Sequence, residues 1–104
     1  MTPAETLTAA ADRLRVAAQD VPAGPWWGDD LDEVQSPTGQ VARAVGAAAY
    51  PKSRYIAAMH PGVGRALAAW LESWTGIDVA EDGPLAEELR HALTVARQIL
   101  GSTA

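Results

Sequence analysis

The chain has no cysteine and no phenylalanine, and its eight Lys and Arg residues are outnumbered by thirteen carboxylates. Without cysteine there is no disulfide, no thiol nucleophile and no cysteine-ligated zinc site. The basic residues are scattered and the formal net charge is −5. Because nucleic-acid affinity comes from clustered Lys and Arg, this pattern argues against a direct nucleic-acid partner. We also expect no cofactor.

Long apolar runs are missing as well, since none approaches the roughly 20 residues needed to cross a bilayer. The first residues, MTPAETLTAA, have neither the basic region nor the apolar region of a secretion signal. We therefore expect a cytoplasmic protein that makes no membrane contact. The 48% hydrophobic and 20% charged residues are typical of a globular chain, and the length predicts one small domain, residues 1–104.

Helical patterns account for most of the sequence. Thr2 and Glu5 form a capping box, and Pro22 ends the helix that follows. A short helix runs from Pro51 to about Met59, and Pro61 suits the first position of the next one. The last helix is expected to start at 82–84 and to end at Gly101.

One β-hairpin is predicted between the first two helices. The segment 36–39, Ser-Pro-Thr-Gly, is a tight turn, and the flanks 31–36 and 39–45 carry valines among polar residues. Residues 21–30, rich in Pro and Gly, are expected to form a loop without regular structure. The fold class is therefore α+β and mostly helical, with three main helices, a short one and a hairpin inserted after the first helix.

The two histidines are the first candidates for chemistry. A general base at His60 needs a partner and a pocket, and the chain contains no GxSxG or HExxH frame. The position favours a corner residue between two helices. His91 follows Glu87 by one helical turn, but zinc usually takes three or four ligands. We predict an exposed Glu–His pair, no metal site and no catalytic residue.

A dense acidic run beside two tryptophans is the second candidate. Its carboxylates could hold a divalent cation or act on a sugar, but the spacing fails the EF-hand pattern. The alternatives are a solvated loop rim or a protein-binding patch, because Trp is enriched among interface hot spots. The residues of this patch are Trp26, Trp27, Asp29, Asp30, Asp32 and Glu33.

Two further tryptophans, Trp70 and Trp74, are one turn apart on the same helix. In a chain without Phe they are expected to fill the core. The alternative is a homodimer face, since a chain of this size has a modest core.

Two segments carry a resemblance to known proteins. The segments 23–26, AGPW, and 55–72, YIAAMHPGVGRALAAWLE, resemble small actinobacterial phage and prophage proteins of unknown function, distantly similar to Ead-like early phage proteins. Where such proteins often have Asn or Asp followed by Ala, this chain has Ser53-Arg54. The resemblance implies a phage or prophage origin and no catalytic residues.

Taken together, these observations predict a non-catalytic protein-interaction module that binds a host or phage protein. One form of this function is an inhibitor of a host defence protein, with the acidic residues occupying a nucleic-acid site. The runner-up is a self-assembling scaffold protein that dimerises through the helix bearing Trp70 and Trp74. A small enzyme or metal-binding protein using both histidines and the acidic run is the third hypothesis.

Overall fold

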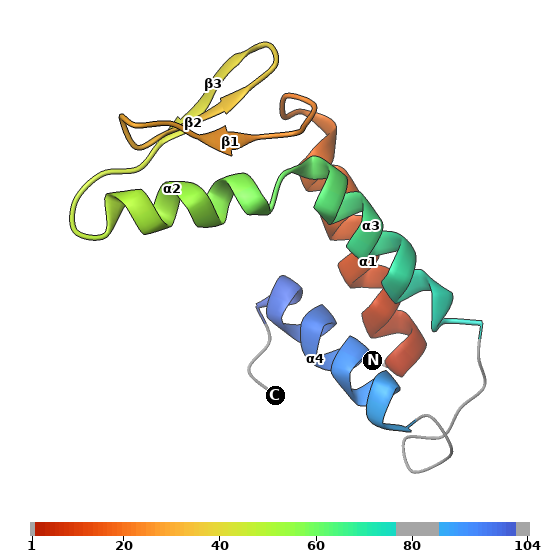
Figure 1. The fold of residues 1–104 in the computed structure, drawn as a ribbon. Helices are drawn as coiled ribbons and strands as arrows, with labels where there is room; N and C mark the ends of the chain where they lie inside the picture. Colours follow the sequence, from red (N-terminus) through yellow and green to blue (C-terminus); the bar gives the residue numbers. More distant parts are fainter. Residues whose placement is uncertain (1, 77–85, 102–104) are drawn as a thin grey trace. The chain divides into compact units, whose positions relative to one another are not determined.

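The computed structural model describes residues 2–76 and 86–101, which form four helices and three strands (Figure 1). The chain divides into two compact units, one containing Met1–Ala17 and Arg65–Ala104 and the other Ala18–Gly64. Helices and an antiparallel sheet together confirm the α+β, mostly helical fold class. That residues 1–104 form a single domain stays a prediction from chain length.

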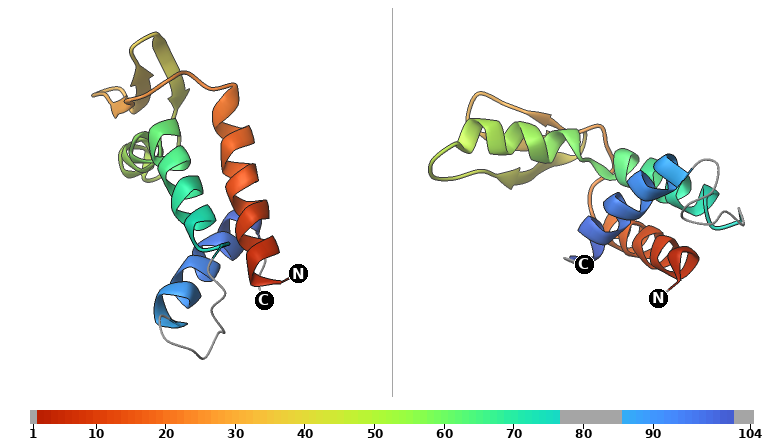
Figure 2. Two further views of the ribbon diagram at one scale, coloured as in Figure 1. Left: turned by 90° about the vertical axis from the view of Figure 1, so that its right-hand side faces the viewer. Right: turned by 90° about the horizontal axis from the view of Figure 1, so that it is seen from below.

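The first unit is helical and contains most of α1 (Pro3–Gln19) and α3 (Pro61–Ser73), together with α4 (Ala86–Leu100). Within it, α1 and α3 run side by side in opposite directions (Figure 2). Both hydrogen bonds of the predicted capping box at the start of α1 are present: the N–H of Glu5 donates to Thr2 Oγ1 over 3.1 Å, and the N–H of Thr2 donates to Glu5 Oε1 over 3.0 Å.

The core of this unit is made almost entirely of small and medium side chains. Alanine at an interface lets helices approach closely, and the leucines fill the remaining volume. The buried cluster consists of Leu7, Ala10 and Ala11 from α1, Ala68 and Leu71 from α3, and Leu89, Ala92, Leu93 and Ala96 from α4. Arg15 and Glu72 form a hydrogen-bonded ion pair between α1 and α3, with side chains about 40% exposed.

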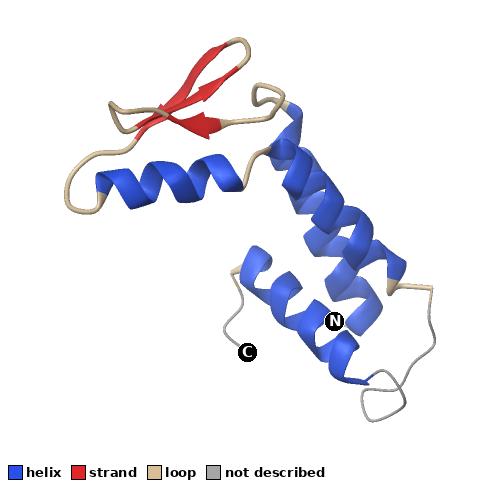
Figure 3. Ribbon diagram, viewed as in Figure 1, coloured by secondary structure: helices blue, strands red, loops and turns tan. Residues whose placement is uncertain are grey.

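The second unit is a three-stranded antiparallel sheet with α2 (Ala49–Ala58) against one face (Figure 3). The strands are β1 (Trp27–Gly28), β2 (Glu33–Ser36) and β3 (Gly39–Arg43), in that order across the sheet. The predicted hairpin is confirmed in β2 and β3, with slightly shorter ends. Gly39 closes its turn with a φ of +131°, a conformation that favours glycine.

Helix α2 covers the sheet through its small side chains. Ser53 is fully buried, and Ala57 is 6% exposed. Gly28 lies so near α2 that a Cβ built on it is 3.5 Å from Ser53 Oγ. Val34, its partner in register on β2, is also fully buried. Gly28 and Val34 therefore face α2, and their strand neighbours face away from it.

The sequence predicts no regular structure over residues 21–30, but Trp27 and Gly28 form β1, because Trp27 is in register with Gln35 and Gly28 with Val34. Cross-strand pairing of this kind depends on residues distant in sequence, and local Pro and Gly content does not predict it. The expected start of α4 at 82–84 lies outside the described residues.

Candidate functional site

The outer face of the sheet, which points away from α2, carries an exposed indole. Trp27 alternates with Gly28 along β1, so its side chain lies on the face opposite α2, where it is 47% exposed. Its register partner Gln35 and the partner of Gln35 on β3, Gln40, share this face. A large apolar ring thus stands among polar neighbours on an otherwise hydrophilic sheet surface.

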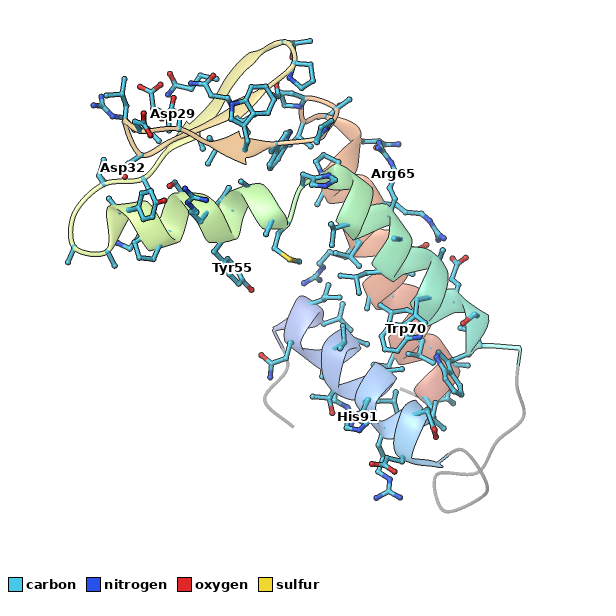
Figure 4. All side chains as sticks on the ribbon, in the orientation of Figure 1. Asp29, Asp32, Tyr55, Arg65, Trp70 and His91 are labelled. Carbon is cyan, nitrogen blue, oxygen red and sulfur yellow. The ribbon has the colours of Figure 1, made fainter. Side chains whose placement is uncertain are left out.

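Asp29 shapes the turn between β1 and β2 (Figure 4). Its Oδ1 accepts hydrogen bonds from the backbone N–H groups of Leu31 (2.9 Å) and Glu33 (3.0 Å), and its Oδ2 accepts one from Gln35 Nε2 (2.9 Å). The amide of Gln35 and the backbone N–H of Glu33 lower the pKa of the Asp29 carboxyl, with a smaller contribution from the Arg43 charge. Both oxygens of this carboxylate are therefore used in hydrogen bonds that stabilise the turn.

The rest of the acidic run is presented to solvent to different degrees. Asp30 is exposed, whereas Glu33 is half-buried and accepts a hydrogen bond from Gln35 Nε2 (3.0 Å). Asp32 is half-buried and has a φ of +62°, a backbone conformation that non-glycine residues rarely adopt. Leu31, at the tip of the turn, is 67% exposed. The turn therefore displays an apolar side chain between carboxylates.

Trp26 belongs to the loop scaffold. Its indole Nε1 donates a hydrogen bond to the carbonyl oxygen of Pro22 over 2.9 Å, and its side chain is half-buried. The predicted patch of six residues therefore divides by role. Trp26 and Asp29 hold the local structure, and the backbone of Asp32 forms part of the turn. Trp27, Asp30 and Glu33 remain available for contact.

Sequence reasoning missed Leu31, Gln35 and Arg43 as members of this surface. Arg43 pairs in register with Glu33, and its charge acts on Asp29. The alternation of the predicted hairpin is the signal that places Gln35 and Glu33 on one face, because residues two apart on a strand point the same way. We call Trp27, Asp30, Leu31, Glu33, Gln35 and Arg43 the outer sheet patch.

His60 lies between the end of α2 and Pro61, the first residue of α3, at the helix boundary that the sequence predicted. Its Nδ1 accepts a hydrogen bond from the N–H of Gly62 over 3.1 Å, at the start of α3, which begins at Pro61. The backbone of Gly24 also approaches the ring closely, since a Cβ built there would lie 2.6 Å from Nδ1. The ring thus caps a helix and packs against a loop. Because Nδ1 is an acceptor, the neutral ring carries its proton on Nε2.

His91 forms the expected pair on α4 (Figure 4). Its Nε2 is 3.8 Å from Glu87 Oε1, and both side chains are more than 70% exposed. Over residues 2–76 and 86–101, no group of three or more His, Cys, Asp or Glu side chains is arranged to hold a metal ion.

The two residues of the second tryptophan pair, Trp70 and Trp74, also differ in their exposure to solvent. Trp74 is half-buried and packs against the helical core, as expected for a core residue. Trp70 is 38% exposed and does not belong to that cluster, so the expectation that it fills the core is wrong. The adjacent Leu71 is fully buried instead. Helical geometry explains this, because residues one apart point about 100° from each other and only one of them faces the core centre.

Comparison of the chain with protein-family models, with curated proteins and with solved structures gives no match. The resemblance to phage proteins therefore stays a prediction. Among the helices described, none is long and apolar enough to cross a membrane.

Proposed function

We propose that this protein is a non-catalytic interaction module that binds another protein through the outer sheet patch. The observation that carries the proposal is Trp27, 47% exposed on a sheet face whose reverse side is fixed against α2. A partly exposed indole is the kind of anchor that dominates binding energy when it enters a pocket on a partner.

The neighbouring side chains indicate the chemistry of that partner. Asp30 and Glu33 lie in the acidic run beside Trp27, and Leu31 adds exposed apolar surface. Carboxylates at the rim of an interface favour a basic partner surface and speed association with it. The partner is therefore a protein with an apolar pocket surrounded by Lys and Arg.

The resemblance to phage proteins supplies a biological setting for this proposal. In that setting the partner is a host or phage protein and the complex forms in the host cytoplasm. A nucleic-acid-binding host defence protein fits the required surface, since its basic site is where acidic side chains would compete with phosphates. Inhibition of such a protein is the specific form of the function that we propose.

Affinity enrichment from a bacterial host lysate, quantified by mass spectrometry, tests the proposal. The informative variants are Trp27→Ala and the double variant Asp30→Asn/Glu33→Gln, which leave the turn carboxylate of Asp29 intact. Each should reduce recovery of the partner at least about tenfold, as removal of an interface hot spot does. Trp70→Ala, a matched change in the helical unit, should recover the partner as well as the wild type. Full recovery by Trp27→Ala would refute the assignment.

A scaffold function is the second candidate, favoured by the exposure of Trp70. Its indole stands on α3, one helical turn before Trp74, which follows the last residue of α3, and a second copy could cover it. In this case light scattering would show a dimer that Trp70→Ala converts to a monomer. A strict monomer at high protein concentration would rule the scaffold function out.

A further inference from the structure

Helix α2 presents large apolar side chains on the side that faces away from the sheet. Tyr55 is 72% exposed and Ile56 is 36% exposed, and Tyr55 points away from the sheet (Figure 4). Ser53 and Ala57, which are buried, lie on the opposite side of the helix. The small side chains therefore pack α2 onto the sheet, and the large ones are available for contact with another molecule.

These large side chains line an open groove of about 470 Å³. Its walls are Pro51, Lys52, Tyr55 and Ile56 of α2 together with Ala44, which follows β3. At about 100° per residue, Lys52 lies between Tyr55 and Ile56 around the helix, so a cation stands within the apolar surface. The groove therefore suits an apolar side chain that is accompanied by a carboxylate.

The Lys52 ammonium can receive such a carboxylate. Its Nζ donates a hydrogen bond to the carbonyl oxygen of Val45 over 3.3 Å. An ammonium group has three N–H donors, so it can hold this carbonyl and a carboxylate at the same time.

The acidic and basic residues of this unit are concentrated in different elements. Residues 29–33 contain four carboxylates and no cation, whereas α2 contains Lys52 and Arg54 and no carboxylate. Arg43 is the one cation of the outer sheet patch, and it is in register with Glu33. The unit therefore presents a mainly acidic face on one side of the sheet and a basic helix on the other.

We propose that the groove on α2 binds the outer sheet patch of a second copy of this chain. The patch supplies the exposed apolar side chains that the groove requires, Trp27 (47% exposed) and Leu31 (67% exposed), with carboxylates beside them. The groove in turn supplies the apolar surface and the cation that the patch requires. This inference rests on the proposed function, because it uses the outer sheet patch as a protein-binding surface, and it adds the chain itself as a partner.

Contact between unlike faces is favoured over contact between like faces. Two α2 grooves against each other would bury both Lys52 side chains, and α2 has no carboxylate to meet them. Two outer sheet patches would bring mostly carboxylates together. A contact between unlike faces on opposite sides of the sheet is heterologous, so successive copies continue into an open chain or a ring instead of stopping at a closed dimer.

Two variants, each with one face removed, provide the test. Trp27→Ala loses the anchor of the patch and keeps the groove, and Tyr55→Ala loses a wall of the groove and keeps the patch. In sedimentation equilibrium the mass of the wild type should rise with protein concentration beyond that of a dimer. Each variant alone should associate at least about tenfold more weakly, as removal of an interface hot spot does. An equimolar mixture of the two should form a 1:1 complex and no larger species, because it retains one pair of intact faces.

NMR locates the contact in this mixture. Unlabelled Tyr55→Ala should shift the amides of the groove in ¹⁵N-labelled Trp27→Ala, and with the labels exchanged the amides of the outer sheet patch should shift. Adding Lys52→Glu to the Trp27→Ala chain should weaken the complex about tenfold, and adding Lys52→Arg should preserve it. Trp70→Ala, a matched change on α3, should associate as the wild type does.

Three results would each overturn the inference. The first is no complex in the mixture at millimolar protein, and the second is self-association that Trp70→Ala abolishes. The third is a set of groove shifts produced by phosphatidylglycerol vesicles but not by the Tyr55→Ala chain, which would identify a lipid surface as the occupant.

Enrichment from the host lysate separates these failures from a failure of the proposed function. Tyr55→Ala should still recover the host partner, because its outer sheet patch is intact. Recovery of a host protein that depends on Trp27, without any complex in the mixture, would overturn the inference alone. A 1:1 complex in the mixture together with full recovery of the host protein by Trp27→Ala would support the inference and refute capture of that protein through the patch.

Discussion

Replacing Gly24 with alanine tests how the loop before β1 packs against His60, the residue that precedes α3. The new Cβ would lie 2.6 Å from His60 Nδ1 and 3.1 Å from its Cγ, so the ring would have to move. The ring has little room, because a Cβ on Gly62 would lie 2.8 Å from its Cε1. Overpacking of this kind lowers the free energy of unfolding by about 1–3 kcal/mol. Alanine also reduces the conformational entropy of the unfolded chain, which raises the free energy of unfolding by about 0.4–1 kcal/mol. We expect a net loss of stability of about 0–2.6 kcal/mol, about 1.3 kcal/mol at the midpoints of the two ranges.

Urea unfolding followed by tryptophan fluorescence measures this loss, and a double-mutant cycle assigns its cause. In the His60→Ala background the added methyl group no longer meets the ring, so Gly24→Ala should cost almost nothing. Gly64→Ala is the matched control, because a Cβ there meets nothing within 4 Å and alanine favours the helix. An equal cost of Gly24→Ala in both backgrounds would refute the reasoning.

Two further predictions concern the turn carboxylate and the core. The pKa of Asp29 is lowered in the folded state, so its stabilising effect is complete above its ordinary value of 3.8 and is lost as the pH falls through the folded-state pKa. Asp29→Asn should therefore lower Tm at neutral pH. The difference in Tm between this variant and the wild type should shrink below about pH 4. The same difference in Tm at neutral pH and below about pH 4 would contradict this role. On α3, Leu71→Ala should cost about 2–5 kcal/mol and Trp70→Ala about 1 kcal/mol or less, and equal losses in chemical denaturation would contradict their different burial.

Local signals predicted the helices and the hairpin well. Thr2 and Glu5 form both capping hydrogen bonds, and Pro61 begins α3 with His60 just outside it. Such features depend on residues within one turn of each other, and propensity and capping describe these interactions directly. Gly101, with a φ of +75°, closes α4 as predicted.

The candidate site was only partly predictable, because its residues differ in their long-range contacts. Trp26 and Trp27 are adjacent in sequence, yet a hydrogen bond to Pro22 holds one and strand alternation turns the other outward. Asp29 resembles its acidic neighbours until its bonds to Glu33 and Gln35 are known. The acidic and Trp-rich composition was enough to predict the patch. Only the sheet register and the side-chain hydrogen bonds show which of its residues hold the local structure and which are available for contact.

The exposure of the large apolar side chains on and just after α2 escaped prediction for a similar reason. Tyr55, Ile56 and Met59 are apolar, and apolar residues in a short helix are expected to face a core. In the structure the small residues Ser53 and Ala57 face the sheet instead, because β1 approaches closely at Gly28. The larger side chains are thereby left on the opposite side of the helix.

The most direct test of the central claim is photo-crosslinking from position 40 in a bacterial host lysate. A benzophenone amino acid would replace Gln40, an exposed residue on the same sheet face as Trp27, in one variant and Val16, 65% exposed on α1, in a control variant. We expect a light-dependent adduct with one discrete protein from position 40 and none with that protein from position 16. Absence of an adduct at position 40, or the same adducts from both positions, would contradict the claim that the outer sheet patch is a protein-binding surface.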